Sequence, residues 1–230
     1  MHPLEIKDQL KSLMKKASSI EPCLAKRLDE INRWVKDIKP GSLTAKKFVM
    51  AFLLEVIRDA DVWLKLKGLS SPELQDSAFE KMTPTEQYWY GYLFPLWLNS
   101  NDPKFYIWKQ KLMSCEFSQT DDDILKSIVQ TIESRGGTVW RRYIADFSMA
   151  TDLIVSYRQR KPLCLQVTSV SNNYSQKKYQ NWQNTLQMWV IDRGLFLSYN
   201  PGKPDFLEQL VTITLHNSDF LPLGRYLQFP

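Results

Sequence analysis

In the second half of the chain an acidic side chain precedes one apolar run, and a side-chain amide lies within the next. Asp152 opens the run Leu153-Ile154-Val155, and Gln166 lies inside Leu163-Cys164-Leu165-Gln166-Val167. Carboxylate and amide oxygens are ligands that hard divalent cations prefer in proteins. A cation held by such ligands can hydrolyse phosphodiesters, because it stabilises charge on the phosphate and activates water.

The segment between the two runs predicts how these side chains meet. Arg158-Gln159-Arg160-Lys161 is polar, and two β-rich runs around a polar turn are typical of a hairpin. A hairpin places the start of its first strand near the end of its second, so we expect Asp152 to lie near Gln166.

This arrangement resembles the core of the PD-(D/E)XK, or restriction-endonuclease-like, nuclease superfamily, in which an Asp starts one strand and a D/E/Q-x-K triplet lies on the next. In that resemblance Asp152 is the bridging carboxylate, Gln166 replaces the usual Glu as in Mrr-like enzymes, and Val167 supplies its carbonyl. Glu133, near the end of the preceding helix, matches the helical acid of the family. The resemblance implies Mg²⁺- or Mn²⁺-dependent cleavage, most plausibly of DNA, in defence, repair or mobile-element processing.

The chain departs from the family pattern at Thr168, which stands where the lysine is expected. A hydroxyl cannot supply the positive charge that a lysine gives to the water or the phosphate. Lys161, Lys177 and Lys178 are candidates to replace it by proximity in sequence. The alternative is a catalytically inactive nuclease-fold protein that acts as a scaffold for protein or DNA.

Each candidate site residue also has a purely structural interpretation. Asp152 at the start of a strand can be a turn or cap residue. Gln166 can be a buried amide whose hydrogen bonds are satisfied by its backbone neighbours. Glu133 can be a solvated side chain on the polar face of its helix.

The elements that would position these residues divide the chain into two halves. Up to about residue 111 the apolar residues recur at helical spacing. We expect helices near 5–19, 28–38, 44–66, 72–81, 84–98 and 103–114. The sequence therefore predicts an α/β protein with a helical bundle over 1–115 and an α/β domain over 116–230.

In the second half the pattern changes to an αβββαβ core with a central mixed sheet. A helix begins at Asp121 and ends before Gly136-Gly137. The expected elements after it are strands at 138–144, 151–157 and 162–170, a helix at 180–192 and a strand at 195–199. The last apolar run, 210–215, is predicted to be an edge strand.

Basic residues near the candidate site could bind nucleic acid. They occur in the first strand, in the hairpin turn and before the later helix, at Arg141, Arg142, Arg158, Arg160, Lys161, Lys177 and Lys178. Such a cluster could line a phosphate-binding groove. In the alternative interpretation these side chains simply face water, which is the default for charged residues.

Composition limits the remaining classes of function. With 230 residues, 43% of them hydrophobic, and a net charge of +5, the chain predicts a packed domain compatible with a polyanionic partner. Its three widely spaced cysteines favour a reducing, cytoplasmic setting, and no apolar run predicts a membrane span. The aromatic segment Tyr88–Trp97 is expected in a core or in a homodimer or partner interface. No phosphate loop or serine-hydrolase motif occurs.

Overall fold

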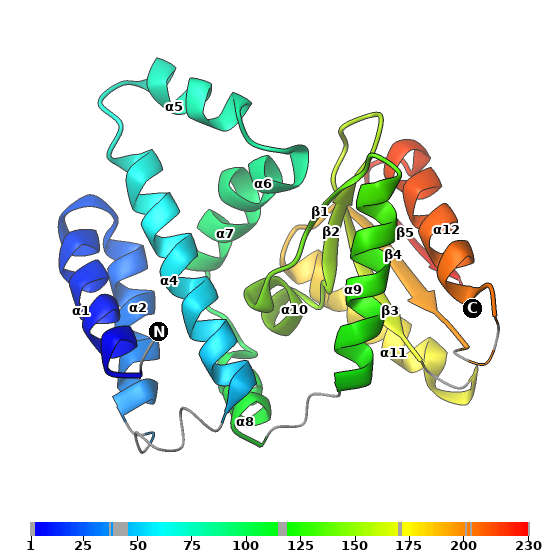
Figure 1. Cartoon of the computed structure of the whole chain (residues 1–230), viewed down its shortest axis with the longest axis horizontal. Helices are drawn as coiled ribbons and strands as arrows, with labels where there is room; N and C mark the ends of the chain where they lie inside the picture. Colours follow the sequence, from blue (N-terminus) through cyan, green and yellow to red (C-terminus); the bar gives the residue numbers. More distant parts are fainter. Residues whose placement is uncertain are drawn as a thin grey trace. The chain divides into compact units, whose positions relative to one another are not determined.

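A computed structural model describes residues 3–36, 38, 46–114, 119–169, 172–200, 202 and 204–229 of the chain. The chain divides into two compact units, which are coloured along the sequence in Figure 1. A helical unit comprises Met1–Lys81 and Tyr90–Phe117, and an α/β unit comprises Met82–Trp89 and Ser118–Pro230. The third boundary between the units, at 117/118, lies close to the boundary at 115/116 expected from the sequence, whereas the short segment before Tyr90 joins the α/β unit.

The first unit is helical, as the apolar spacing predicts. Its described helices are α1 Pro3–Ile20, α2 Pro22–Lys36, α4 Lys47–Lys67, α5 Pro72–Glu80, α7 Phe94–Asn99 and α8 Phe105–Ser114. Helix α4 buries one stripe that includes Phe52, Val56 and Trp63. Among the residues described, no helix combines the length and apolarity needed to cross a bilayer.

The aromatic segment is a core element. It follows helix α6 Pro84–Tyr88, which Thr83 caps, and continues through the π-helix η1 Trp89–Leu93 into α7. Pro95 has no backbone N–H to donate into a regular α-helical ladder, and the wider π-turn directly precedes it. Within the helical unit Tyr90 is buried and its hydroxyl donates to Asp59 at 2.8 Å. Because side chains such as Phe94 are buried too, this segment no longer argues for a homodimer surface.

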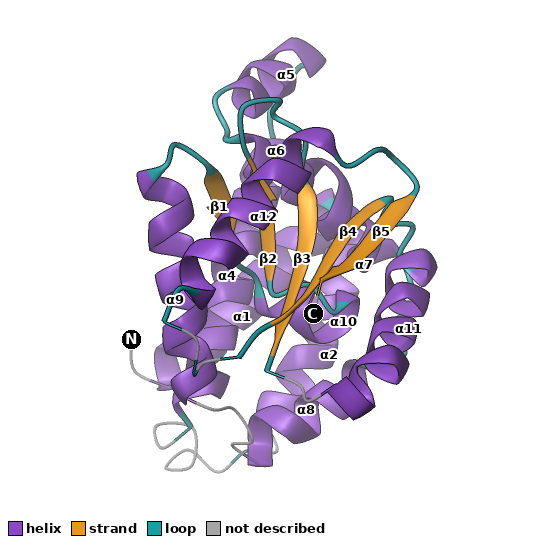
Figure 2. Ribbon diagram, turned by 90° about the vertical axis from the view of Figure 1, so that its right-hand side faces the viewer, coloured by secondary structure: helices purple, strands orange, loops and turns teal. Residues whose placement is uncertain are grey.

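The α/β unit is built on one mixed five-stranded sheet of the described strands (Figure 2). After α6 the order is α9 Gln119–Ser134, β1 Thr138–Trp140, α10 Tyr143–Met149, β2 Leu153–Ser156, β3 Leu163–Thr168, α11 Asn172–Met188, β4 Arg193–Ser198, α12 Phe206–Phe220 and β5 Arg225–Phe229. The strands are neighbours in sequence order. Strands β1, β2 and β3 pair antiparallel, whereas β3, β4 and β5 pair parallel.

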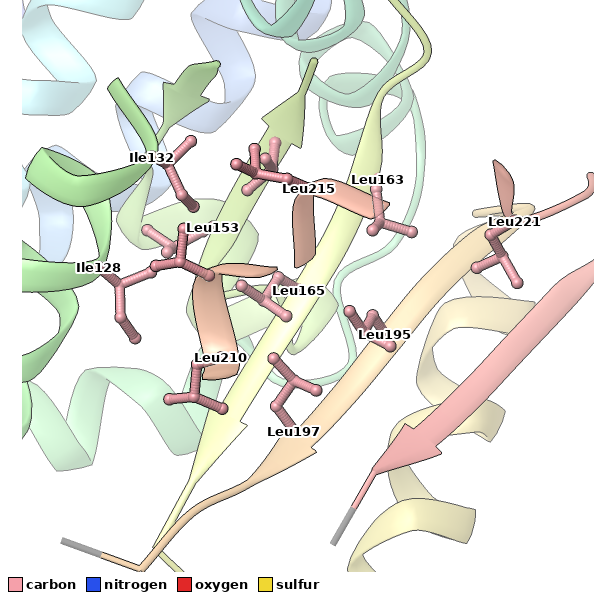
Figure 3. Close-up of a cluster of buried hydrophobic side chains, with 12 residues drawn as sticks. Ile128, Ile132, Leu153, Leu163, Leu165, Leu195, Leu197, Leu210, Leu215 and Leu221 are labelled. Atoms are coloured by element: carbon pink, nitrogen blue, oxygen red, sulfur yellow. The ribbon is translucent and has the colours of Figure 1, made fainter. Parts of the chain in front are cut away.

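One face of the sheet packs against α9 and α12. Alternate strand residues such as Leu153, Leu165 and Leu195 point into a cluster with Ile128 of α9 and Leu210 of α12 (Figure 3). Burial of each such side chain stabilises the fold by about 1.5–3 kcal/mol. This cluster is the main apolar core of the α/β unit.

The other face packs against α10 and α11. Two tryptophans of α11 reach α10, since the Trp182 and Trp189 indoles donate to the carbonyls of Ala150 and Ser148 at 3.1 and 2.8 Å. Gly194 of β4 allows α11 to approach, because a Cβ there would lie 2.4 Å from a Leu186 methyl carbon. Side chains alternate between the two faces along a strand, so Asp152 and the strand residues on its side of the sheet face α10 and α11.

Two of the strand predictions are wrong, the first entirely and the second in part. Residues 210–215 belong to helix α12, with burial at Leu210, Val211, Thr214 and Leu215, which is a helical spacing. The strand expected over 138–144 ends at Trp140, and Tyr143–Met149 forms α10. The edge strand is instead β5, and α11 begins earlier than 180.

Candidate functional site

Asp152 and Gln166 lie together at one end of the sheet, as the hairpin predicts. Leu153 pairs with Leu165, so the two polar residues follow as the next opposed positions. The Gln166 amide nitrogen and the Val167 backbone N–H each donate to Asp152 Oδ2 at 2.7 Å. Two hydrogen bonds to one oxygen thus anchor the carboxylate to β3. Asp152 itself is only 7% exposed.

The surroundings of Asp152 oppose its negative charge. Burial raises the pKa of this carboxyl well above its usual value, and the nearby charge of Asp146 on α10 raises it further. The hydrogen bond from Val167, the charge of Arg141 and the amide of Gln166 act in the opposite direction and do not compensate. A buried carboxyl beside a second acid is the electrostatic pattern expected where a cation or a proton binds.

Backbone geometry places the Val167 carbonyl on the same side. In an extended strand the N–H and C=O of one residue face the same neighbour, and the Val167 N–H faces Asp152. Thr168 faces the other neighbour, since its carbonyl accepts from Tyr199 N at 3.0 Å. Oxygen ligands from Asp152 and Val167 can therefore converge on one point.

The side-chain amide of Gln166 is oriented to donate a hydrogen bond, whereas it was expected to act as a metal ligand. It presents its nitrogen to Asp152 and donates a hydrogen bond to the carboxylate. Rotation of the terminal amide by half a turn would present its oxygen instead. Gln166 can therefore either donate a hydrogen bond to the acid or act as a metal ligand, but not both at once.

Thr168 lies on the same strand face as Gln166, two residues further along β3. Its partner across the parallel pair is Ser198 of β4. The Ser198 hydroxyl is buried and has no hydrogen-bond partner in the described part of the chain. An unsatisfied hydroxyl beside the site is a polar group that a bound ligand could satisfy.

Glu133 is not brought to this end of the sheet. It is exposed in the last turn of α9, which leads into β1 at the end of the sheet remote from Asp152. Asp122, eleven residues earlier and therefore about 16 Å along the helix, is at the near end. Its carboxylate contacts Arg141 at 2.6 Å and Lys126 at 2.7 Å. The helical acid near the site is thus Asp122.

Asp122 and Arg141 form a charged pair beside the candidate site. Partial burial alone would raise the pKa of Asp122, but hydrogen bonds from Lys126 and Arg141 hold it below its usual value. Burial likewise opposes the charge of Arg141. The hydrogen bond to Asp122 and the charge of Asp122 outweigh that effect, so the pKa of Arg141 is raised. Both groups therefore stay charged, and Arg141 keeps a positive charge near Asp152.

The predicted basic residues divide between the two ends of the unit. Lys177 and Lys178 are exposed early in α11, which follows the carboxyl end of β3, so they lie toward the Asp152 end. Arg158, Arg160 and Lys161 are exposed in the β2–β3 turn, at the opposite end.

Arg142 differs from these residues because it is buried. Its guanidinium lies 3.9 Å from the centre of the Trp140 ring and donates to the Arg141 carbonyl at 2.9 Å. It is 7% exposed and does not offer its charge to solvent. The seven basic residues therefore do not form one continuous groove in the α/β unit.

The location of the candidate site follows a general rule for open α/β sheets. Ligands bind beyond the carboxyl ends of parallel strands, and β3 and β4 end here. Asp146 was not expected near the site, because helix α10 was not predicted. Asp122 was not expected there either, because Glu133 was predicted to be the helical acid.

Across the described ranges, no group of three or more His, Cys, Asp and Glu side chains is arranged to hold a metal ion. A cation at Asp152 would therefore depend on amide and backbone oxygens in addition to the acids. No family model, curated protein or solved structure matches the chain. Function is consequently inferred from the site itself.

Proposed function

We propose that the α/β unit is a nuclease-like domain that binds Mg²⁺ or Mn²⁺ at Asp152 and cleaves phosphodiester bonds, most plausibly in DNA. The observation that carries this proposal is the burial of Asp152 beside Asp146. Retaining an acid that the fold opposes has a cost in stability, and such residues cluster at functional sites. Defence, repair or mobile-element processing is the setting that the resemblance to PD-(D/E)XK nucleases implies.

The order of elements supports the same proposal. With α10 set aside, α9 through β4 run α-β-β-β-α-β around a mixed sheet. The same order was expected for a restriction-endonuclease-like core, and it therefore supports the proposal of that core. The unpaired thiols of Cys23 and Cys164 support a reducing, cytoplasmic setting.

The residues of this chain have distinct roles in the proposed site. The Asp152 carboxylate and the Val167 carbonyl would hold the cation, with Gln166 joining them once its amide is turned. A bound cation would stabilise charge on the phosphate and lower the pKa of water. Arg141 holds a positive charge near Asp152, and the exposed Lys177 and Lys178 would contact a phosphate backbone.

The second candidate function is that of a nuclease-fold scaffold without catalysis. Thr168 favours it, because this position lacks the charge that the resemblance requires. A scaffold of this kind would bind a protein or DNA partner and leave phosphodiester bonds intact.

Cleavage by the full chain tests the two candidates. Plasmid, single-stranded DNA and RNA are incubated with Mg²⁺ or Mn²⁺ and the wild type, Asp152→Asn or Asp123→Asn. Asp123 is an exposed acid of α9 and serves as the matched control. We expect Asp152→Asn to lose at least 100-fold in rate and Asp123→Asn to remain near the wild type.

Two results would contradict the enzymatic proposal. Equal cutting by Asp152→Asn would place any catalytic site elsewhere. Absence of cutting by all three proteins, with folding verified by circular dichroism, would favour the scaffold, and a gel shift would then decide whether its partner is DNA.

A further inference from the structure

The end of the sheet opposite Asp152 carries an open groove that the proposed nuclease site does not use. Its volume is about 630 Å³, within the range of ligand-binding clefts. The lining comes from the residue after α9, the β2–β3 turn and α12, and includes Arg135, Tyr157, Arg158, His216 and Phe220. Figure 1 shows this turn and the end of α12 at the same end of the sheet.

Large apolar side chains are exposed at the same end of the sheet, and one of them, Phe220, lines the groove. Phe220 and Leu223 are 66% and 76% exposed, and Val190 on the neighbouring segment is 58% exposed. These segments lead into β5 and β4, which are adjacent strands. Exposed apolar side chains gathered beside a groove mark sites of protein interaction more often than isolated ones do.

The segments that carry these side chains are fixed by Arg193. Its guanidinium donates to the carbonyls of Pro162, Leu221, Asn217 and Ser218 at 2.7–3.0 Å. The β2–β3 turn, β4 and the end of α12 are thereby tied together. A surface held in this way loses little conformational entropy when a partner binds.

Val190 provides an independent observation. Its φ of 52° is left-handed, a conformation that is unusual for a β-branched residue. Glycine is the ordinary residue at this point after a helix. An exposed valine kept there at a cost in backbone energy is explained if its side chain serves a contact.

The charge around the apolar centre is mainly positive. Arg158, Arg160 and Lys161 are exposed in the turn, whereas Asp219 is buried and accepts from Gln159 N at 2.8 Å. Glu208 is paired with Arg135 in the groove wall, and Asp192 is exposed nearby. The rim thus suits an acidic partner.

We propose that this turn-end surface, comprising Arg158, Arg160, Lys161, Val190, Phe220 and Leu223, docks an acidic segment of a protein partner that carries apolar anchor residues. Two of the three apolar side chains, Val190 and Leu223, are aliphatic and favour a protein segment over nucleic acid, because bases stack on aromatic rather than aliphatic groups. The basic rim selects acidic residues on either side of the anchors. This docking function is independent of metal binding at the other end of the sheet.

A random dodecapeptide display library selected on the immobilised full chain tests the proposal. We expect enrichment of peptides in which Asp or Glu flank Leu, Phe or Trp. Anisotropy of labelled selected peptides then compares the wild type with Phe220→Ser/Leu223→Ser and with Arg158→Glu/Arg160→Glu/Lys161→Glu. Each variant should weaken binding at least 10-fold, while its thermal midpoint remains close to that of the wild type because the side chains are exposed.

Lys177→Glu/Lys178→Glu is the matched charge control, since these exposed cations lie toward the other end of the sheet. It should change peptide affinity less than twofold. Absence of enrichment, enrichment without acidic residues, or equal losses in the control would overturn the proposal. The proposal would also be overturned if Phe220→Ser/Leu223→Ser lost binding to oligo(dT), or lost a dimer that the wild type forms in sedimentation. The surface would then serve nucleic acid or a second copy.

Discussion

The two ends of the sheet in the α/β unit each bury a charged side chain, and their environments differ. Arg193 at the turn end is 5% exposed and gives four hydrogen bonds to backbone carbonyls. Asp152 at the other end is 7% exposed and accepts two hydrogen bonds on one oxygen, beside the like charge of Asp146. Burial opposes the charge of both side chains.

The difference separates a charge with a structural role from one for which we propose a functional role. Arg193 closes the carboxyl end of α12 and joins three segments, so its burial is repaid within the fold. Asp152 joins β2 to β3 but remains opposed by burial and by the charge of Asp146. A cation at Asp152 would remove that opposition, whereas Arg193 already has its partners.

The largest effect is expected from Arg193→Leu. The substitution leaves the carbonyls of Pro162, Asn217, Ser218 and Leu221 without their buried donor, and should lower the free energy of unfolding by about 3–5 kcal/mol. Urea denaturation measures this change. Arg193→Lys should recover little of the loss, because an ammonium cannot reproduce the planar fork of the guanidinium. A change below about 1 kcal/mol would show that Arg193 is not structural.

Gly194→Ala tests the sheet that both ends share. The added methyl would lie 2.4 Å from a Leu186 carbon and 2.8 Å from the Trp182 ring, so these side chains or α11 itself must shift. We expect a loss of about 1–3 kcal/mol in urea denaturation, as for other overpacked cores. Gly202→Ala, in an exposed segment, is the control and should change stability by less than about 0.5 kcal/mol.

Asp152→Asn should act in the opposite direction and stabilise the metal-free protein. Because burial raises the pKa of Asp152 in the folded state, its stabilising contribution is complete below the unfolded value of 3.8 and is lost as pH rises through the folded value. At neutral pH the amide should therefore gain about 1–3 kcal/mol over the carboxylate. Urea denaturation in EDTA from pH 4.5 to 8 measures the difference.

The gain from Asp152→Asn should grow with pH over that range. A variant that is equally destabilised at every pH would mean that the carboxylate has a structural role like that of Arg193. The comparison between the two ends would then fail.

The smallest effect is expected at Val190. Val190→Gly relieves the left-handed backbone and should raise the free energy of unfolding by about 1 kcal/mol. Val190→Ala removes the apolar side chain but retains most of the strain, so it should change stability less. If Val190→Gly destabilises the protein in urea, packing of the side chain outweighs the backbone strain.

Much of the fold follows from local sequence signals. The helical half and the β2–β3 hairpin were predicted, because their apolar spacing and turn residues are unambiguous. Helix α10 was missed because Ile144, Ala145, Phe147, Ser148 and Met149 are all buried, which leaves little amphipathic pattern. The run Leu210–Leu215 is rich in β-branched residues, and its packing against the sheet overrides that local preference.

The candidate site was predicted in part. The hairpin alone was sufficient to bring Asp152 to Gln166, because strand pairing fixes which residues are opposed. Which acid of α9 lies near the site depends on which end of the helix reaches it, and tertiary packing determines that end. Glu133 was therefore chosen, although Asp122 is the acid paired with Arg141 near Asp152.

Calorimetric titration of the full chain with Mn²⁺ tests the central claim most directly. The wild type and Asp123→Asn should bind one ion at the Asp152 site, and Asp152→Asn should lose that binding at least 100-fold while remaining folded. Mn²⁺ binding of equal affinity and stoichiometry in Asp152→Asn and the wild type, or no binding in any of the three proteins, would contradict the assignment of Asp152 as a metal ligand.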